Sequence, residues 1–305
     1  MIQRIKNKVR HRSDISPIFA TMMVKLIECP RDAMQGLKEF IPTEKKIEYI
    51  NQLLKVGFDT IDFGSFVSHK AIPQMADTHE VIKSLDLKDS TSGLLAIVAN
   101  LRGAEDACLY KQITYIGYPF SISETFQRRN TNTTIDESLA TVKEIQAVCA
   151  DKGKKLVIYI SMGFGNPYGD PWNVNIAQHW VNELAELGIR IISLSDTIGV
   201  STSDSVYYLF SNLIPPYPDV EFGAHLHTTP VSWREKIHAA WQGGCHRFDG
   251  ALKGLGGCPM AKDDLTGNMP TEKMITYFDE IIPDFGINRL ELSKAMVLAD
   301  SLFYH

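Results

Sequence analysis

Two histidines separated by a single residue, His225 and His227, close a short apolar segment at 221–227. The composition of this segment is typical of a β-strand. Side chains alternate between the two faces of a strand, so residues i and i+2 point the same way. Two imidazoles on one face form half of a divalent-metal site, and the alternative is a pair of hydrogen-bonded core histidines. Their place at a strand end favours the metal interpretation.

Charged residues also end the segment 24–30. Arg31 and Asp32 follow Pro30, and Glu28 lies four residues before Asp32. In an extended chain this spacing places both carboxylates on one side and turns Arg31 to the neighbouring face. A carboxylate combined with imidazoles supplies the mixed oxygen and nitrogen ligands that suit Mg²⁺ or Mn²⁺. Arg31 is always charged and is suited to stabilising a developing oxyanion, although an Arg–Asp pair can also be only a salt bridge.

A glycine-rich segment, 254–259, carries one cysteine, Cys258. The segment lacks the Lys-Ser/Thr ending of a phosphate-binding loop and the spacing of a dinucleotide-binding loop. We therefore expect a mobile loop that delivers Cys258 to the site as an acid or base, the alternative being an inert, packed thiol.

Three further polar residues, Asp196, Asn268 and Glu272, follow segments that resemble strands. Asp196 precedes Thr-Ile-Gly, and Asn268 follows a glycine. Both contexts are also common in turns and helix caps. Their shared position after expected strands makes them candidates for the same site.

Eight short apolar, β-branched segments must position these residues, at 24–30, 60–65, 94–100, 113–120, 155–162, 190–196, 221–227 and 247–252. Most are continuous apolar runs, as in parallel strands covered on both faces. Helical patterns lie between them, the clearest at 43–56, 135–151, 175–187 and 287–303. The alternation predicts an α/β fold, a single (β/α)₈ TIM barrel with an additional C-terminal helix, rather than a doubly wound open sheet. In such barrels the chemistry is at the C-terminal ends of the strands.

Composition excludes several classes of protein. The chain has 305 residues, is 44% hydrophobic and carries a formal charge of −5, which does not fit a basic nucleic-acid binder. No apolar run approaches the ~20 residues needed to cross a membrane. Five scattered cysteines are a poor disulfide framework and indicate a reducing compartment.

The N-terminus requires a separate interpretation. We expect residues 1–22 to form a solvated arm and residues 23–305 to form the barrel domain. Residues 1–13 are basic and contain no acids, which is also the composition of an organellar transit peptide. The expected location is therefore the cytoplasm, with an organellar matrix as the alternative.

Read together, these motifs resemble the 3-hydroxy-3-methylglutaryl-CoA (HMG-CoA) lyase family of barrel metallolyases, which is related to isopropylmalate and citramalate synthases. The resemblance runs from about residue 23 to 303. Its motifs are Glu28–Asp32 with Gln35, Ser65–Ser68, Pro73–Met75, Ser193–Gly199, His225-x-His227, Gly254–Pro259 and Gly267–Glu272. The glycine loop with its cysteine is the most specific of them, because the related synthases lack that cysteine and carry extra C-terminal domains.

The resemblance implies a role for each matching residue. Asp32, His225, His227 and Asn268 would bind Mg²⁺ or Mn²⁺, Arg31 would face the thioester oxygen, and Cys258 would sit on a catalytic loop. Glu28, Asp196 and Glu272 would support the site or handle protons, and Gln35, Ser65 and Ser193 would contact the substrate. The implied reaction is retro-Claisen cleavage of a 3-hydroxyacyl-CoA to acetyl-CoA and acetoacetate. The expected partners are an acyl-CoA and a second copy of the chain, with no nucleic acid or membrane.

Several positions depart from the family pattern. Ala33 stands in place of a glycine, Asp62 in place of a glutamate and Thr228 in place of an aspartate. Pro230 also replaces a tyrosine, and the stretch from 258 to 268 is one residue longer. These changes leave the expected metal ligands unaltered. They alter the surroundings of the site and therefore concern which acyl group the substrate carries. Two alternatives remain open, a condensing synthase or 2-oxo-acid aldolase of the same superfamily, and a barrel that binds a metal or acyl-CoA without turnover.

Overall fold

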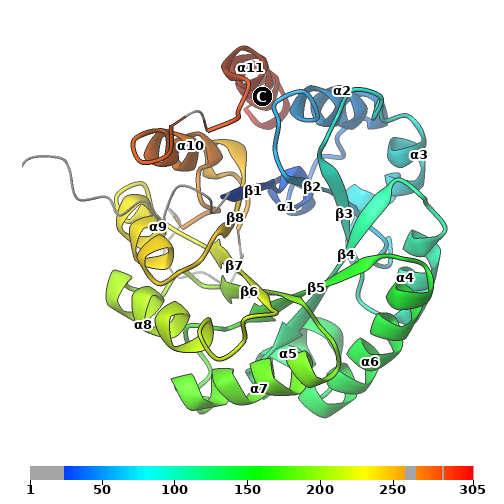
Figure 1. Cartoon of the computed structure of the whole chain (residues 1–305). Helices are drawn as coiled ribbons and strands as arrows, with labels where there is room; N and C mark the ends of the chain where they lie inside the picture. Colours follow the sequence, from blue (N-terminus) through cyan, green and yellow to red (C-terminus); the bar gives the residue numbers. More distant parts are fainter. Residues whose placement is uncertain (1–23, 258–265, 284, 305) are drawn as a thin grey trace, which may run out of the picture.

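The protein is described here from a computed structural model, which covers residues 24–257, 266–283 and 285–304. The described chain forms eight parallel strands that close into a barrel in sequence order (Figure 1). The strands are β1 (Lys25–Glu28), β2 (Thr60–Ser65), β3 (Gly93–Ile97), β4 (Ile113–Ser121), β5 (Lys155–Ser161), β6 (Ile191–Asp196), β7 (Glu221–Leu226) and β8 (Arg247–Gly250). The predicted (β/α)₈ barrel is confirmed, and each expected strand is present. The expected arm at 1–22 lies outside the described residues.

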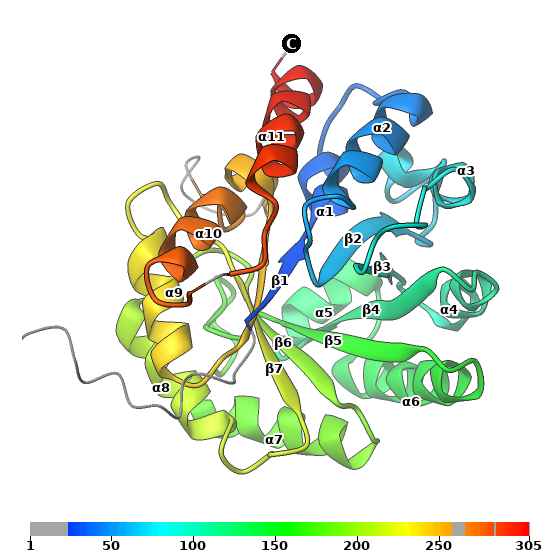
Figure 2. The ribbon, with the colours of Figure 1, turned by 45° about the horizontal axis from the view of Figure 1, so that its top comes forward.

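Helices form a ring around the barrel (Figures 1 and 2). One helix follows each strand before the next begins: α2 (Thr43–Leu53), α3 (Thr78–Lys83), α4 (Leu101–Cys108), α6 (Ile135–Asp151), α7 (Val174–Glu186), α8 (Ser203–Leu213), α9 (Trp233–Gln242) and α10 (Thr271–Asp279). Additional short segments follow the C-terminal ends of four strands: α1 (Pro30–Gln35), η2 (Pro73–Met75), α5 (Glu124–Thr131) and η3 (Leu252–Gly254). The expected C-terminal helix is α11 (Arg289–Phe303). No helix in the described ranges is long and apolar enough to cross a membrane.

The sequence predicted the helix boundaries to within a few residues, because local capping signals mark them. Helix α6 begins at a capping box, in which Thr134 and Glu137 each accept a hydrogen bond from the other's backbone N–H. Helix α2 ends at Leu53 instead of the expected residue 56, and the chain turns at Gly57, whose φ is +95°.

The end of the first strand differs from the sequence-based expectation. The strand stops at Glu28, and Pro30 is the first residue of helix α1, which contains Arg31 and Asp32. Proline at the first helical position has the φ angle that a helix needs, and the N–H it lacks would be unpaired there anyway. The extended geometry that grouped Glu28 with Asp32 is therefore wrong.

Two apolar layers hold the barrel. The larger lies between the sheet and the helices, and the smaller lies inside the barrel around Leu95, Tyr115, Val157, Tyr159 and Ile191. Burial on both faces explains why the strands read as continuous apolar runs. The polar residues that break these runs consequently point either into the barrel or toward a helix.

The chain closes where its first and last parts meet. Strand β1 pairs with β8 from Lys25 opposite Arg247 to Glu28 opposite Gly250. Helix α11 packs beside α2, where Gln52 Nε2 donates to the Glu291 backbone oxygen at 2.9 Å (Figures 1 and 2). The closure brings the segments that follow β1, β7 and β8 to one mouth of the barrel.

Candidate active site

The C-terminal ends of the strands surround a cavity of about 410 Å³. Its lining is divided between polar and apolar side chains. The polar ones are Arg31, Asp32, Gln35, Asn130, Thr131, Ser161, Ser195, Thr197, His225 and His227, and the apolar ones include Val67, Ile72, Ile97, Pro119 and Phe126. Most of the residues expected to bind metal or stabilise charge thus share one cavity.

Strand β7 and the residue that follows it bring both histidines to this cavity, as the i, i+2 spacing predicts, and their ring centroids are 5.5 Å apart. Each imidazole is fixed by a different acceptor. His225 Nδ1 lies 3.2 Å from Asp249 Oδ2, and His227 Nδ1 donates to the Thr197 carbonyl at 2.9 Å. With Nδ1 protonated, His227 Nε2 carries a lone pair, and this buried atom has no hydrogen-bond partner among the described residues.

The two histidines differ in basicity. Burial, assisted by the neighbouring His225, lowers the pKa of His227 to about 4. Burial alone would also lower the pKa of His225, but the hydrogen bond and charge of Asp249 outweigh it and raise that pKa. His227 is therefore a neutral imidazole at physiological pH, as metal ligation requires.

Helix α1 presents Arg31, Asp32 and Gln35 as one hydrogen-bonded group. Arg31 Nη1 donates to Asp32 Oδ1 at 3.0 Å and to Gln35 Oε1 at 2.8 Å. Gln35 Nε2 in turn donates to Asp32 Oδ1 at 2.6 Å. Positions i+3 and i+4 of a helix lie on one face, which explains how residues so close in sequence form this closed network.

Strand β2 supplies the main partner of Arg31. The Nε and Nη2 atoms of Arg31 donate to the Asp62 carboxylate at 3.0 and 2.5 Å, which forms a buried ion pair through two guanidinium nitrogens. Burial raises the pKa of Asp62 to about 6, although the adjacent Arg31 opposes that rise. Asp32 shows the opposite balance: burial would raise its pKa, but Arg31 and the two histidines hold that pKa below its ordinary value. Asp32 is therefore an ionised carboxylate.

Asn268 completes the group from a loop before α10. Its Nδ2 donates to Asp32 Oδ2 at 2.6 Å and to the Leu255 carbonyl at 2.8 Å, which leaves Oδ1 as the atom able to bind a cation. Gly256, with φ +80°, passes directly over this contact, and a Cβ there would lie 2.7 Å from the Asp32 carbonyl oxygen. Only glycine fits this crossing of the two loops.

The donor set fits a hard divalent cation. One ligand atom from each of Asp32, His225 and His227 lies within 4.8 Å of the others, and Asn268 adjoins Asp32. A carboxylate, an amide oxygen and two imidazoles are suitable ligands for Mn²⁺ and Mg²⁺. The orphaned lone pair of His227 Nε2 is the atom that a cation would satisfy.

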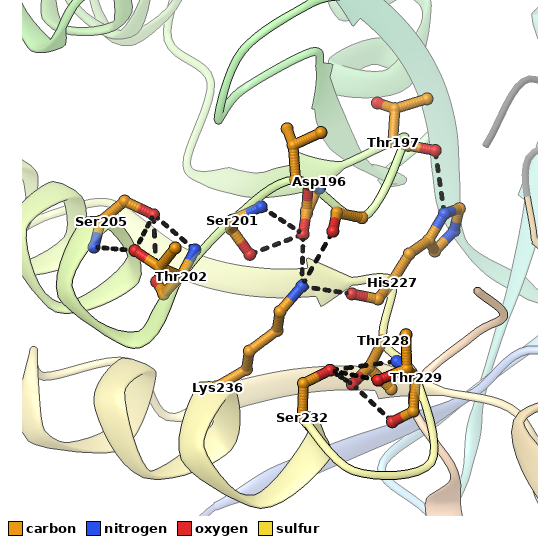
Figure 3. A network of polar contacts seen from close by, with 12 residues as sticks. Asp196, Thr197, Ser201, Thr202, Ser205, His227, Thr228, Thr229, Ser232 and Lys236 are labelled. Atoms are coloured by element: carbon orange, nitrogen blue, oxygen red, sulfur yellow. Dashed lines mark hydrogen bonds and ion pairs between the residues drawn. The ribbon is translucent and has the colours of Figure 1, made fainter. Parts of the chain in front are cut away.

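Asp196 is brought next to this site but does not enter the cavity. Its carboxylate accepts the backbone N–H groups of Val200 and Ser201, the Ser201 hydroxyl and, at 2.8 Å, the Lys236 ammonium (Figure 3). Lys236 also donates to the His227 carbonyl at 2.8 Å. This buried ion pair joins the loop after β6 to the end of β7, so Asp196 positions His227 and the Thr197 carbonyl that orients its ring.

Four other predicted site residues lie outside the cavity. Glu28 accepts hydrogen bonds from the Leu252 N–H and the Thr271 hydroxyl, and Glu272 accepts one from the Lys253 N–H. Ser65 is bonded to the Ile97 carbonyl and the Val67 N–H, and Ser193 is buried deeper in the barrel. The two glutamates thus hold the segment before residue 258 in place. Cys258 itself lies outside the described residues.

Sequence reasoning missed Asp249, Lys236 and Ser195. Asp249 holds His225, Lys236 holds Asp196, and Ser195 lines the cavity with a hydroxyl that has no partner among the described residues. A usable signal existed for Asp249, since an acid inside the buried strand Arg247–Gly250 must have a polar partner. Lys236 gave no such signal, because a lysine in an amphipathic helix normally faces water.

The structure is a closed (β/α)₈ barrel that carries an Arg–Asp pair, two histidines and an asparagine at its C-terminal mouth. This combination is typical of a metal-dependent enzyme. The HMGL-like family profile matches residues 24–296. The chain is 32% identical over 275 residues to a cytoplasmic 3-hydroxy-3-methylglutaryl-CoA lyase of Danio rerio, covering 89% of this chain and 81% of the relative. It is 34% identical to a 3-hydroxy-3-isohexenylglutaryl-CoA/hydroxy-methylglutaryl-CoA lyase of Pseudomonas aeruginosa, covering 89% and 90%.

A solved HMG-CoA lyase from A. baumannii, in complex with coenzyme A and 3-methylmalate, superposes with a TM-score of 0.83 at 30% identity, covering 93% of this chain and 92% of that one. The chain therefore belongs to the HMGL-like family. The predicted resemblance to HMG-CoA lyases is confirmed.

Proposed function

We propose that this chain is a metal-dependent carbon–carbon lyase that cleaves 3-hydroxy-3-methylglutaryl-CoA, or a close 3-hydroxyacyl-CoA, to acetyl-CoA and acetoacetate. The observation that carries the proposal is the convergence of Arg31, Asp32, His225 and His227 on one cavity, with Asn268 bonded to Asp32 at its edge. An acyl-CoA substrate agrees with the coenzyme A bound by the solved relative.

The side chains would divide the work as follows. Asp32, His225, His227 and Asn268 would hold Mg²⁺ or Mn²⁺, which supplies Lewis-acid chemistry at the substrate hydroxyl when bound. Asp32 and His225 are the candidate bases on the cavity wall for the proton that leaves this hydroxyl. Arg31, clamped by Asp62, would face the thioester oxygen and stabilise the enolate that forms when the carbon–carbon bond breaks. One such donor is typically worth about 3 kcal/mol of barrier.

The changes from the family pattern leave this machinery in place. Asp62 still contacts two nitrogens of Arg31, and Ala33 is a buried residue of helix α1. The Thr228 hydroxyl is bonded to Ser232 at 2.9 Å in the loop after β7 (Figure 3). These observations favour the lyase over a barrel without turnover.

The direct test is incubation of the purified chain with 3-hydroxy-3-methylglutaryl-CoA and Mg²⁺ or Mn²⁺, with acetoacetate as the measured product. We expect acetoacetate and acetyl-CoA in equal amounts, lost on chelation and restored by adding the cation. Condensation of acetyl-CoA with a 2-oxo acid, in the absence of cleavage, would instead identify a synthase.

Cys258 is proposed, from the sequence resemblance alone, to protonate the enolate carbon. Cys258→Ser should reduce turnover sharply while leaving metal affinity unchanged, since the thiol handles protons and is not a ligand. Cys245→Ser is the matched control: this thiol is buried behind the barrel wall and donates to the Arg247 carbonyl at 3.2 Å. Equal activity of the two variants at saturating Mg²⁺ would remove Cys258 from the mechanism.

We further propose that the chain acts in the cytoplasm as a homodimer, with residues 1–22 forming an arm outside the barrel domain. One of the similar lyases is named as cytoplasmic. Light scattering of the full chain measures the oligomeric state, and fractionation of tagged protein distinguishes the cytoplasm from an organellar matrix.

A further inference from the structure

A second group of side chains able to bind a metal ion lies beside the group of Asp32, His225 and His227 described above. It consists of Cys29, from the turn between β1 and α1, His225 from β7 and Asp249 from β8. One ligand atom of each lies within 4.8 Å of the other two. Cys29 is 1% exposed and Asp249 is 2% exposed, so both are buried.

The polar atoms of this group are incompletely paired. Asp249 uses Oδ2 to contact His225 Nδ1, while its Oδ1 is buried and has no hydrogen-bond partner within the described part of the chain. The Cys29 thiol has one long contact, 3.8 Å to the Ile27 carbonyl. A buried carboxylate oxygen without a partner is costly, and it is satisfied by a water, a proton or a cation.

We propose that Cys29, His225 and Asp249 form a second cation site, selective for a divalent ion that binds thiolate ligands, such as Zn²⁺. Cysteine, histidine and aspartate are the three ligand types that Zn²⁺ takes, whereas Mg²⁺ and Mn²⁺ prefer sites without sulfur. The site differs from the oxygen and nitrogen group of Asp32, His225 and His227 by its sulfur ligand and by Asp249, which contacts Nδ1 of the His225 ring. Binding releases the thiol proton to solvent.

Sharing His225 makes the two sites antagonistic. Asp249 faces Nδ1 of this ring, so a cation between Asp249 and His225 takes Nδ1 as its ligand. A neutral imidazole has only one nitrogen lone pair, and the proton then resides on Nε2. His225 can therefore serve one cation at a time unless it becomes an imidazolate. Zn²⁺ at the second site consequently inhibits an enzyme that needs His225 for Mg²⁺ or Mn²⁺.

Co²⁺ is the probe for the test, because it replaces Zn²⁺ and gives a near-ultraviolet charge-transfer band only when a thiolate is a ligand. The full chain, without substrate, is titrated with Co²⁺ and its absorption spectrum is recorded. We expect the band in the wild type and its absence in Cys29→Ser. Cys245→Ser and Cys258→Ser are the controls and should keep the band. This measurement does not depend on lyase activity, so it is independent of the proposed function.

The outcomes separate the alternatives. No thiolate band in the wild type, or a band that survives in Cys29→Ser and disappears in Cys258→Ser, overturns the proposal. If Cys29→Ser does not fold by circular dichroism, Cys29→Ala is used, and Asp249→Asn should weaken the Co²⁺ binding that is measured at the thiolate band by at least about tenfold. Unchanged Co²⁺ affinity in Asp249→Asn overturns the site as well.

Inhibition is the second readout once cleavage has been measured. One equivalent of Zn²⁺ should suppress Mg²⁺-supported turnover of the wild type, and Cys29→Ser should need at least about tenfold more Zn²⁺ for the same suppression. Equal sensitivity of the wild type and Cys29→Ser would show that Zn²⁺ acts elsewhere.

Discussion

Arg31 is held by more groups than a lysine could satisfy. Its guanidinium contacts Asp62 with two nitrogens and also donates to Asp32 and Gln35. A lysine keeps the charge but has neither the planar fork nor the reach to fill these positions together. We therefore expect Arg31→Lys to fold normally and to lose about 10²–10³-fold in turnover.

The matched control for this substitution is Arg128→Lys, because Arg128 pairs with Glu124 on the exposed face of helix α5. Steady-state kinetics and circular dichroism of both variants provide the comparison. Near-normal turnover of Arg31→Lys would reduce Arg31 to a salt-bridge partner.

Asp249 is predicted to act through His225. Its carboxylate accepts the Nδ1 hydrogen bond that orients the imidazole toward the cavity, and Asn in its place lacks the charge. Replacing such an outer partner typically costs 10–100-fold in metal affinity, and we expect Asp249→Asn to fall in about that range. Mn²⁺ binding followed by electron paramagnetic resonance measures the loss. Asp279→Asn, at an exposed ion pair with Arg289, should bind Mn²⁺ like the wild type.

At this scale the sequence predicted well which two histidines share one strand face, and predicted poorly which other polar residues face the cavity. His225 and His227 were placed correctly because a strand has a strict period of two. Glu28, Ser65 and Ser193 were expected in the site and lie outside the cavity. Their strands are apolar on both faces, so no polar–apolar alternation indicates which side faces the barrel interior.

Two adjacent elements depend on a single buried ion pair. Lys236 on helix α9 joins Asp196 at the end of β6 to the His227 carbonyl at the end of β7. Removing one partner leaves an uncompensated buried charge, which typically costs about 3–5 kcal/mol. We expect Lys236→Met and Asp196→Asn each to destabilise the fold, and the double variant to be more stable than the sum of the two losses predicts.

Urea unfolding of the four proteins in this cycle measures the coupling. Strictly additive losses would show that the two charges do not depend on each other. A structural partnership also predicts that Lys236→Met weakens Mn²⁺ binding, because the loop that carries the Thr197 carbonyl loses its anchor on β7.

Helix α1 shows what element-level prediction missed. The segment 24–30 was read as one strand, although Pro30 already marked a helix start. Six residues are too few for a periodic signal, and the loop contacts that stabilise α1 come from residues more than 200 positions away, such as Asn268. A sequence window cannot contain such contacts.

At the scale of the whole molecule, Glu28 makes the stability of the closed barrel depend on pH. It is fully buried and bonded to Leu252 and Thr271, near the opposite end of the chain. Burial raises its pKa from 4.5 to about 8. Between these values the folded protein retains a proton that the unfolded chain has lost. The contribution of Glu28 to stability is therefore complete below about pH 4.5 and is lost as the pH rises through 8.

We expect Glu28→Gln to remove this loss of stability at high pH, since a glutamine can accept a hydrogen bond from the Leu252 N–H and donate one to the Thr271 hydroxyl. The variant should be more stable than the wild type at pH 8.5 and similar to it near pH 5, with each pKa unit worth about 1.4 kcal/mol. Urea unfolding at both pH values tests this. Glu144→Gln, on the exposed face of α6, is the control, and an identical pH slope in both variants would contradict the assignment.

The pairing of β1 with β8 also sets a condition on protein synthesis. Strand β1 ends at Glu28 and its last partner is Gly250, so 250 − 28 = 222 residues must be translated before this edge is covered. At typical rates of synthesis this takes on the order of ten to forty seconds. During that time a strand edge with unpaired backbone N–H and C=O groups is exposed to other nascent chains, a recognised route to aggregation. Efficient production of this protein should therefore depend on chaperones that engage the emerging chain, more than on the stability of the finished barrel.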